Sequence, residues 1–551
     1  MTSVFAVEDF TGGLNLRADV FNIGKNESPD LLNVDIDPRG GVAQRAGSEE
    51  MTTRSITGSS YEPHRLYHWR RSSPNQQLMF AFNNKVHFAT ENDFTDLGIT
   101  TTNTYGAEFA QWIGDTDYLY IAAGKGTSSY KWNGTTATAM SDPSPSNWAD
   151  DLLSPSTGYM PQAEHIAEHL DRIWVAHTEE NGTDHPDRVR WSHPLFPEAW
   201  RENDFIDVVG GGSGIRALVP FSNHILVFKD HAVFAIYGYN EATFQLVPIT
   251  RELGTFSSKT VAVSEQAVYF FSWPDGLFRY NGAKIEDVFA PLRPLIERNE
   301  INRAALGSVH VDWMTRRIFL SMPIGNDPIV IEDYDDTSGD GATYDDFDLK
   351  YDGFERPTAA TSTFVYDPSV GKNGAWTRYS LANGYAMVCG VDYTTPLGIG
   401  GGYFTSPVND YVMRFSDTLA TDDIEEVATN FESFYTAAWQ DLGQPQAKKF
   451  WRAPEFIVTN RNESYALNVN VFHDWNTLTS NRTFNLSYSS SSDLSSPFNV
   501  DQWTELYGSE VVRGDTLGSA RSVQVRFGSS GGVKWGVNGI VYRYSFRKVR
   551  V

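Results

Sequence analysis

Cysteine is almost absent from this chain, since Cys389 is the only one among 551 residues. A single cysteine cannot form an intramolecular disulfide, and it cannot supply the several thiolates of a cysteine-based zinc site. It stands in the apolar run 385–389, where a small buried side chain is the expected role of a free cysteine. Disulfide scaffolds and cysteine zinc modules are therefore excluded.

Long hydrophobic runs are also missing. No stretch approaches the roughly 18 consecutive apolar residues of a membrane-spanning helix. Residues 1–10 have neither the basic start nor the apolar core of a signal peptide. We therefore expect the protein to be made and folded in a cytoplasm, which is compatible with later export inside a particle.

Positive charge is scarce, because 44 Lys and Arg face 69 Asp and Glu and the formal net charge is −25. No basic stripe with interleaved aromatic residues is present, so the chain is poorly suited to holding DNA by neutralising phosphates. The same charge suits a channel wall that must not retain a polyanion sliding past it. It also suits simple solubility, and charge alone leaves both interpretations open.

Aromatic residues are abundant at 14%, and Phe, Tyr and Trp favour pleated, half-buried surfaces. The 45 glycines fit an architecture with many turns. Hydrophobic residues make up 40% of the chain, which is enough for a substantial core. The composition predicts an all-β protein, and the length predicts two or three folded regions.

Between residues 60 and 425 one unit recurs: a short apolar strand, a tight turn and a second strand. The clearest examples are 77–88, 118–134, 224–238 and 267–282. One strand per unit gives starts near residues 78, 118, 172, 224, 267, 317 and 385, and most gaps are 40 to 54 residues. A four-stranded propeller blade has about 40–50 residues. We predict a β-propeller of about seven blades, with six to eight compatible, over a pair of β-sandwiches, whose strands would not group at this period.

The propeller is expected at residues 56–426, after an N-terminal arm at 1–55 that has little periodicity. Residues 427–551 are expected to form a C-terminal sandwich-like β domain, which would serve as a docking platform. Apolar and polar residues alternate there at 467–472, 522–527 and 541–546, as in half-exposed antiparallel strands.

An acidic insertion interrupts the propeller at about 327–356, and we expect an exposed loop that faces the channel, a neighbouring subunit or solvent. Its acidic residues include Glu332, Asp333, Asp335, Asp336, Asp340, Asp345, Asp346 and Asp348. Asp336, Ser338 and Asp340 resemble the first half of a calcium loop, although Phe347 stands where the twelfth-position Glu belongs. They form a weak calcium candidate; no other metal or cofactor is predicted.

Catalytic motifs fail on their context. His165, Glu168 and His169 match the H-x-x-E-H pattern of zinc peptidases, but that pattern needs a helix and here it runs directly into a predicted strand. The segment 369–376 loosely matches a sialidase turn, but its Asp position is occupied by Gly371. A glycosidase would need two facing carboxylates, and the linear order marks no such pair. We therefore predict no catalytic residue and no enzyme.

The arm and the propeller resemble a family of bacteriophage tail proteins, variously called nozzle, tail tubular protein B or packaged-DNA stabilisation protein. The resemblance extends over about residues 8–385 and rests on the order of several modest motifs. These motifs are 10–17 (FTGGLNLR), 31–35, 40–47, 171–176, 188–192, 197–200 and 275–282.

The resemblance implies a structural virion protein of the tail, synthesised in the host bacterial cytoplasm. It implies a homohexameric ring around the channel in which DNA is retained and through which it is ejected. Expected partners are further copies of the chain, adaptor or portal-proximal proteins, tail fibres, passing phage DNA and the host envelope. The alternative is a tail-tip propeller that binds or degrades host surface glycans.

Overall fold

This computed structural model describes residues 3–19, 21–51, 63–71, 76–82, 84–90, 93–101, 106–114, 117–143, 148, 158–325, 359–395, 398, 400–407, 411–424, 427–459, 464–489 and 509–546. Helix within these residues is limited to α1 (Pro294–Glu297) and 3-10 turns at Ser258–Thr260, Ala290–Leu292 and Arg303–Ser308. No described helix has the length and apolar character needed to cross a membrane. The described chain is built from strands, and the all-β prediction is confirmed.

Six four-stranded antiparallel sheets follow one another along the chain, each made of consecutive strands. The first three are β8 (Pro63–Trp69), β9 (Gln77–Phe82), β10 (Lys85–Thr90), β11 (Asp93–Thr100); β12 (Glu108–Trp112), β13 (Tyr118–Ala122), β14 (Tyr130–Trp132), β15 (Ala137–Ala139); and β16 (Gln162–Glu168), β17 (Ile173–Glu180), β18 (Thr183–His193), β19 (Phe196–Asp207). The next three are β20 (Ala217–Phe221), β21 (His224–Phe228), β22 (Val233–Tyr237), β23 (Gln245–Thr250); β24 (Val261–Val263), β25 (Val268–Ser272), β26 (Gly276–Tyr280), β27 (Ile285–Asp287); and β28 (His310–Met314), β29 (Arg317–Met322), β30 (Ser362–Asp367), β31 (Ala375–Tyr379).

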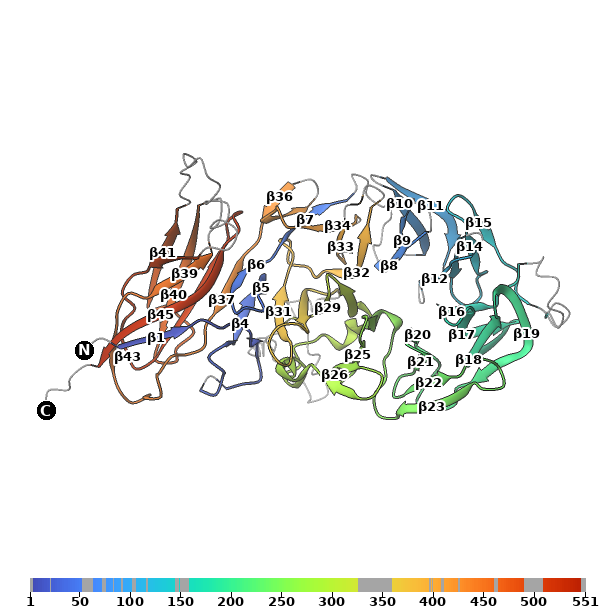
Figure 1. Cartoon of the computed structure of the whole chain (residues 1–551), viewed down its shortest axis with the longest axis horizontal. Helices are drawn as coiled ribbons and strands as arrows, with labels where there is room; N and C mark the ends of the chain where they lie inside the picture. The colour runs from blue at the N-terminus through green and yellow to red at the C-terminus, as the bar shows by residue number, and fades with distance from the viewer. Residues whose placement is uncertain are drawn as a thin grey trace, which may run out of the picture.

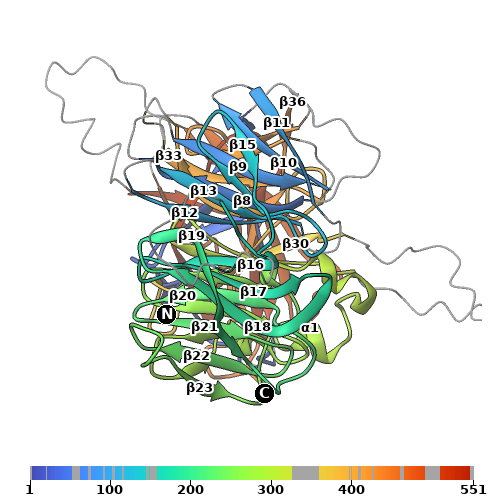
Figure 2. The same ribbon diagram turned by 90° about the vertical axis from the view of Figure 1, so that its right-hand side faces the viewer.

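A seventh sheet has six strands, one of which comes from the other end of the chain. Its order is β32 (Val388–Thr394), β33 (Gly400–Thr405), β34 (Met413–Ser416), β7 (Gly47–Glu50), β35 (Thr421–Ile424) and β36 (Val427–Asn430). The first strands of successive sheets lie against one another from β8 to β32, and β32 lies against β8, so the circle is closed. The small sheets are thus arranged as in a β-propeller around a common centre (Figure 1). Seen from the side, β16–β23 are stacked below β8–β15 (Figure 2).

The second strand of a sheet is its most apolar strand, because neighbouring sheets cover both of its faces. All residues of β9, β21 and β25 are buried. Six of the seven starting positions expected from the sequence lead into second strands, at β9, β13, β17, β21, β25 and β29. The seventh, near residue 385, leads into the first strand β32 of its sheet, since β33 is weakened by three glycines.

Matching turns close two of the sheets. The endings 131–134 and 279–282 share the order cation, aromatic, Asn, Gly. Asn133 accepts hydrogen bonds from the N–H groups of residues 135 and 136, and Asn281 does the same for residues 283 and 284. Gly134 and Gly282 follow with positive φ of 97° and 90°. Both turns connect the third strand to the fourth, because the Asn side chain replaces a backbone partner at the bend.

Two further sheets stand beside the ring, at the left of Figure 1. One has the order β4 (Asp30–Leu32), β37 (Ser433–Thr436), β44 (Val523–Ser529), β40 (Tyr465–His473), β41 (Arg482–Tyr488). The other has the order β42 (Ser509–Arg513), β39 (Glu455–Thr459), β45 (Gly536–Phe546), β38 (Lys449–Trp451), β43 (Gly518–Ala520), with β1 (Ser3–Val7), β5 (Val34–Ile36) and β6 (Val42–Gln44) attached through β45. The alternation predicted at 467–472 is confirmed, since Leu467, Val469 and Val471 are buried in the core that the two sheets share.

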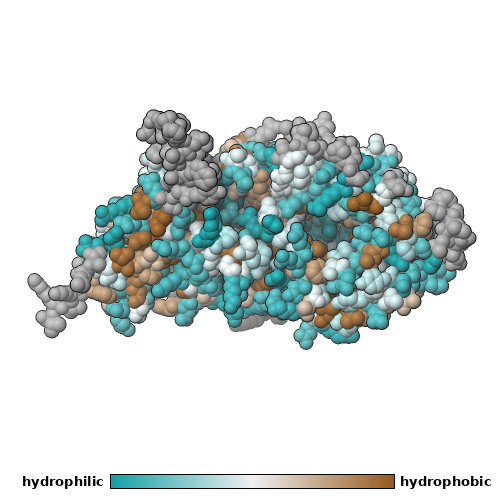
Figure 3. Space-filling model, in the orientation of Figure 1, coloured by the Kyte–Doolittle hydropathy of each residue, from teal (hydrophilic) through white to brown (hydrophobic). Residues whose placement is uncertain are grey.

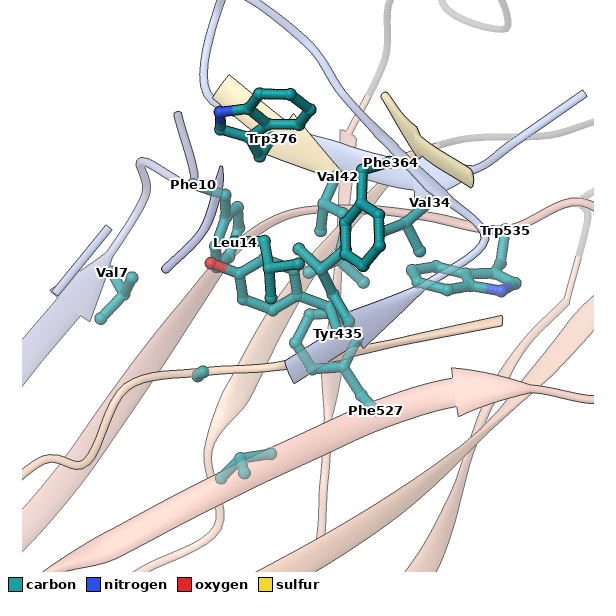
Figure 4. Close-up of a cluster of buried hydrophobic side chains, with 14 of the residues drawn as sticks. Val7, Phe10, Leu14, Val34, Val42, Phe364, Trp376, Tyr435, Phe527 and Trp535 are labelled. Carbon is teal, nitrogen blue, oxygen red and sulfur yellow. The ribbon is translucent and has the colours of Figure 1, made fainter. Parts of the chain in front are cut away.

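The N-terminal segment, expected as an arm, lies between the ring and these two sheets. β1 pairs with β45, β4 with β37, and β7 with β34. Two short strands, β2 (Gly13–Leu14) and β3 (Glu27–Ser28), pair with each other. Phe10 and Leu14 enter one hydrophobic cluster with Trp376 of the ring and Phe527 of the second body (Figure 4). The segment thus joins the two parts through a continuous core.

A buried ion pair lies at this junction. The Arg45 guanidinium donates to both carboxylate oxygens of Asp422 at 3.0 and 2.7 Å, and the two side chains are 1% and 0% exposed. Arg45 Nε also donates to Asn33 Oδ1 at 2.9 Å, and Nη2 donates to the Ser380 carbonyl oxygen at 3.0 Å. The guanidinium stacks 3.8 Å from the centre of the Phe431 ring. One side chain therefore connects the N-terminal segment, the last two sheets of the ring and the start of the C-terminal part.

Removing one member of this pair should destabilise the whole chain. Arg45→Met leaves the Asp422 carboxylate buried without its counter-ion, which costs about 3–5 kcal/mol. We expect a loss of this size in urea unfolding, and a recovery of most of it in Arg45→Met with Asp422→Leu, which removes both charges. Arg39→Met, which breaks an exposed pair with Asp37, is the control and should leave the unfolding curve unchanged. Equal curves for Arg45→Met and Arg39→Met would contradict the structural role of Arg45.

Gly13 is a position where the N-terminal segment packs directly against backbone of the ring. Its φ is +65°, and an added Cβ would lie 2.7 Å from the Trp376 carbonyl oxygen and 2.9 Å from the Trp376 nitrogen. Gly98 has a similar φ of +72° but open space around it.

Both Gly→Ala variants incur the left-handed backbone cost of about 1–2 kcal/mol. Gly13→Ala alone adds a collision with backbone, so we expect it to lose at least about 1 kcal/mol more than Gly98→Ala in urea unfolding. Equal losses would show that the contact with Trp376 relaxes freely.

Candidate functional site

A cavity of about 1890 Å³ occupies the centre of the ring. Its wall is formed by the first strand of every sheet, together with the turn at residues 258–260 that precedes β24. One edge of each first strand borders this cavity and not another strand of its sheet. Polar residues at their ends therefore meet, although they lie far apart in the sequence.

A polar cluster forms where the inner strands begin. We define it as Arg65, Glu108, His165, Lys259, His310, Asp312 and Cys389. These residues come from five different sheets and one connecting turn. All except His165 line the cavity directly, and His165 contacts it through Glu108.

Glu108 is the anion at the centre of the cluster. His165 Nδ1 lies 3.1 Å from its Oε1, Arg65 Nη2 lies 3.5 Å from the same oxygen, and the N–H of Ile166 donates to Oε2 at 3.3 Å. Ser258 provides a further hydrogen bond. Burial by itself would raise the pKa of Glu108, but the positive charges of His165 and Arg65 and these hydrogen bonds lower it to about 2. Glu108 is therefore ionised, and each of its carboxylate oxygens has a hydrogen-bond donor beside it.

Asp312 has the opposite character. Burial raises its pKa to about 7, although the N–H of Gly390 and the charge of Arg65 oppose this change. Its Oδ2 atom is buried and finds no hydrogen-bond partner among the described residues. A carboxyl group with such a pKa is neutral in mildly acidic solution and charged above neutrality.

Cys389 is buried, as the sequence predicted, and its Sγ lies 3.6 Å from His310 Nδ1. Burial raises the pKa of the thiol well above its usual range, and the nearby Asp312 adds to this effect. Burial and the positive charge of Lys259 lower the pKa of His310 well below its usual range. Both groups are therefore neutral, whereas a reactive cysteine needs a stabilised thiolate.

The other end of the cavity has charges of both signs. Five carboxylates line the wall where the inner strands finish, together with four guanidinium groups: Glu168, Asp171, Glu265, Asp367 and Asp392, with Arg70, Arg279, Arg316 and Arg317. The His68 ring and Thr315 N–H bind to Asp392 there, through its carbonyl oxygen and its carboxylate respectively. The cavity is thus polarised along its axis, with the cationic excess confined to the end that holds the polar cluster.

The H-x-x-E-H motif lies on a strand and not on a helix. His165, Glu168 and His169 belong to or directly follow strand β16, so the helical geometry of a zinc peptidase is not formed. In the described part of the chain, no group of three or more His, Cys, Asp and Glu side chains is placed to hold a metal ion. The turn at 369–376 joins β30 to β31, and Gly371 contacts Thr11 of the N-terminal segment.

The acidic insertion at 327–356, including the calcium candidate Asp336, Ser338 and Asp340, lies outside the described residues. Sequence reasoning did not identify the polar cluster. Its only local sign is a charged or histidine residue at the start of an otherwise apolar inner strand, as at Arg65, Glu108 and His310. That sign is too common on exposed strands to predict a site.

No protein-family model and no curated protein matches the sequence. Among solved structures, the chain is similar to the extracellular domain of a hybrid two-component system from B. thetaiotaomicron, with TM-score 0.37, 10% identity and coverage of 76% of this chain and 45% of that chain. It is similar to an ancestral GH74 enzyme, with TM-score 0.38, 10% identity and coverage of 68% and 49%. It is also similar to YCF48 from Cyanidioschyzon merolae, with TM-score 0.34, 8% identity and coverage of 68% and 99%.

The chain therefore spans less than half the length of the first two of these structures. All three TM-scores lie below 0.5, so the description of the fold rests on the sheets themselves.

The pairing of His165 with Glu108 can be tested by titration. Burial lowers the pKa of His165, but the adjacent Glu108 carboxylate outweighs it and raises the pKa above 6.5. This pair therefore stabilises the fold below pH 6.5, and the contribution is lost as pH rises through the folded-state pKa. In Glu108→Gln, NMR titration should find the His165 pKa below 6.5. Glu286→Gln, on the outer strand β27, should leave it raised; an unchanged His165 pKa in Glu108→Gln would contradict the pairing.

Proposed function

We propose that this chain is a structural protein of a bacteriophage tail, which forms a homohexameric ring around the channel for DNA. The seven sheets would be seven propeller blades, and the two sheets beside the ring a sandwich-like docking domain. The supporting observation is where the family-like motifs lie. Segment 10–17 contains Gly13, which touches Trp376, and segment 40–47 contains Arg45 of the buried pair. Three of the seven motifs that carry the resemblance, 10–17, 31–35 and 40–47, lie in the segment that joins the two bodies.

The dimensions of the cavity favour a channel between copies of the chain. The major groove of a DNA duplex alone is about 12 Å wide and about 8.5 Å deep. A cavity of about 1890 Å³ that is walled by inner strands does not accommodate a duplex along its length. DNA would therefore pass on the axis of a ring of subunits, outside each propeller.

The net charge fits such a ring. Six chains at −25 would carry about −150 formal charges. Wherever these acids face the channel, they repel the phosphate backbone and prevent the duplex from adhering during ejection. Within the polar cluster, Glu108 is held by four donors and the Cys389 thiol is protonated, so neither is placed as a free base or a thiolate nucleophile.

Subunit contacts need an exposed apolar surface. Hydrophobic residues gather over the two sheets at the left of the molecule, and separate groups of them lie over the ring at the right (Figure 3). Exposed apolar residues of the β1–β45 sheet are Val4, Phe450, Val511 and Phe546. An exposed apolar group of this kind on a soluble domain marks a contact with another protein. We place the contact between neighbouring copies, or with an adjacent tail protein, on this sheet.

Negative-stain electron microscopy of the purified chain, combined with mass photometry, tests the ring. We expect six-fold particles, and we expect Val511→Glu to weaken them because it introduces a charge into the apolar contact. Val427→Glu is the matched control, since Val427 is 61% exposed and Val511 59% exposed. The control should assemble like the unchanged chain, and neither substitution should alter the melting temperature.

A strictly monomeric particle that is also missing from purified virions would overturn the proposal. Clearing of a host polysaccharide by that monomer would favour the glycan-directed alternative. Equal assembly of Val511→Glu and Val427→Glu would show that the ring contact lies on another surface.

A further inference from the structure

The cavity of a single subunit holds a feature that a structural ring does not require. The end of the cavity at the polar cluster carries Arg65 and Lys259, and the imidazoles of His64 and His310 line the wall beside them. Glu108 is the only residue ionised as an anion in that cluster at mildly acidic pH. The chain as a whole has an acidic excess of 25 charges, so a local excess of cations in a cavity is unusual for it.

We propose that this end of the cavity is a binding site for a small tetrahedral oxyanion, such as phosphate, held between Arg65 and Lys259. Guanidinium and ammonium groups are the side chains that bind phosphate oxygens through charged hydrogen bonds. The anion could be free or form the end of a nucleotide. The two sources share the same phosphate chemistry and are separated by the test.

Arg65 has donors to spare for such an anion. A guanidinium carries five N–H donors in a fixed plane. Its contact with Glu108 is a single long one at 3.5 Å through Nη2, and the side chain is 32% exposed. Glu108 is also bound by His165, Ile166 and Ser258, so Arg65 is one of four partners of this carboxylate.

Lys259 and Arg65 act on the same residues of the cluster. The charge of Lys259 acts on both His310 and Cys389, and so does the charge of Arg65. The two cations are therefore near the same pair of residues on β28 and β32, on the cavity wall. His310 directs Nδ1 to the Cys389 thiol, which fixes the orientation of its ring beside them.

Two acids set the boundaries of the site. Asp312 is neutral in mildly acidic solution, and it faces Arg65, Cys389 and the N–H of Gly390, so it does not repel an anion there. At the other end of the cavity the five carboxylates outnumber the four arginine side chains, whereas Arg65 and Lys259 outnumber the ionised Glu108 at the polar cluster. The anion is thereby confined to the end with the polar cluster.

Isothermal titration calorimetry of the full chain at pH 6 with inorganic phosphate, inorganic sulfate and a deoxynucleoside monophosphate tests the site. We expect one site per chain for phosphate and sulfate. Tighter binding of the monophosphate would identify a nucleotide end as the source, and equal or weaker binding the free anion. Lys259→Gln should weaken phosphate binding about tenfold or more, as expected when a charged hydrogen bond is lost. Lys259→Arg, which keeps the charge, should restore most of the affinity.

Arg70→Gln is the matched control, because it removes one positive charge from the opposite end of the same cavity. It should change the affinity less than about twofold if the site is local. Absence of binding by all three anions, or equal weakening in Lys259→Gln and Arg70→Gln, would overturn the proposal.

A direct location does not depend on how the variants fold. Crystals of the unchanged chain soaked in selenate should have anomalous density between Arg65 and Lys259, and density only at other places would overturn the site. Because every measurement concerns one subunit, its outcome is independent of whether the chain assembles as a ring.

Discussion

The buried pair of Arg45 and Asp422 is the interaction on which the arrangement of the molecule depends. A charge without a partner in this position would cost several kcal/mol, so the segments that supply the two residues must come together. Ser48 Oγ and the Ala382 N–H complete the hydrogen bonding of the carboxylate at 2.8 and 3.1 Å. The N-terminal segment, the last two sheets of the ring and the start of the C-terminal part are thereby fixed relative to one another.

Closure of the ring and attachment of the C-terminal sheets follow from the same segment. Strand β7 lies between β34 and β35, so the last sheet is completed by the beginning of the chain. Phe10 and Leu14, which precede β7 in the chain, belong to the hydrophobic cluster that also contains Trp376 and Phe527 (Figure 4). A continuous core in place of a flexible linker makes the two parts one body. That rigidity suits a subunit whose proposed task is to keep its place in a ring.

The cavity shows how one fold produces two electrostatic environments. All first strands border the same cavity. Arg65 and Lys259 lie where these strands begin, and several carboxylates lie where they end. Glu108 and Asp312 differ in pKa, about 2 against about 7, because the first has four donors and the second has a buried oxygen without one. Neighbouring positive charge, together with hydrogen bonding, separates the two carboxyl groups more than depth does.

Local sequence determined the strands, their turns and the acidity of the chain. Two features depend only on neighbours in the sequence and could be predicted from it. They are the alternation at Leu467, Val469 and Val471 and the matching turns at Asn133 and Asn281. Only the tertiary structure decided which strands are partners. Strands β7 and β34 pair although they lie roughly 370 positions apart in the sequence, and Arg65 and Lys259, roughly 190 positions apart, both act on His310. Side-chain periodicity fixes which face of a strand is buried, but not which other strand covers that face.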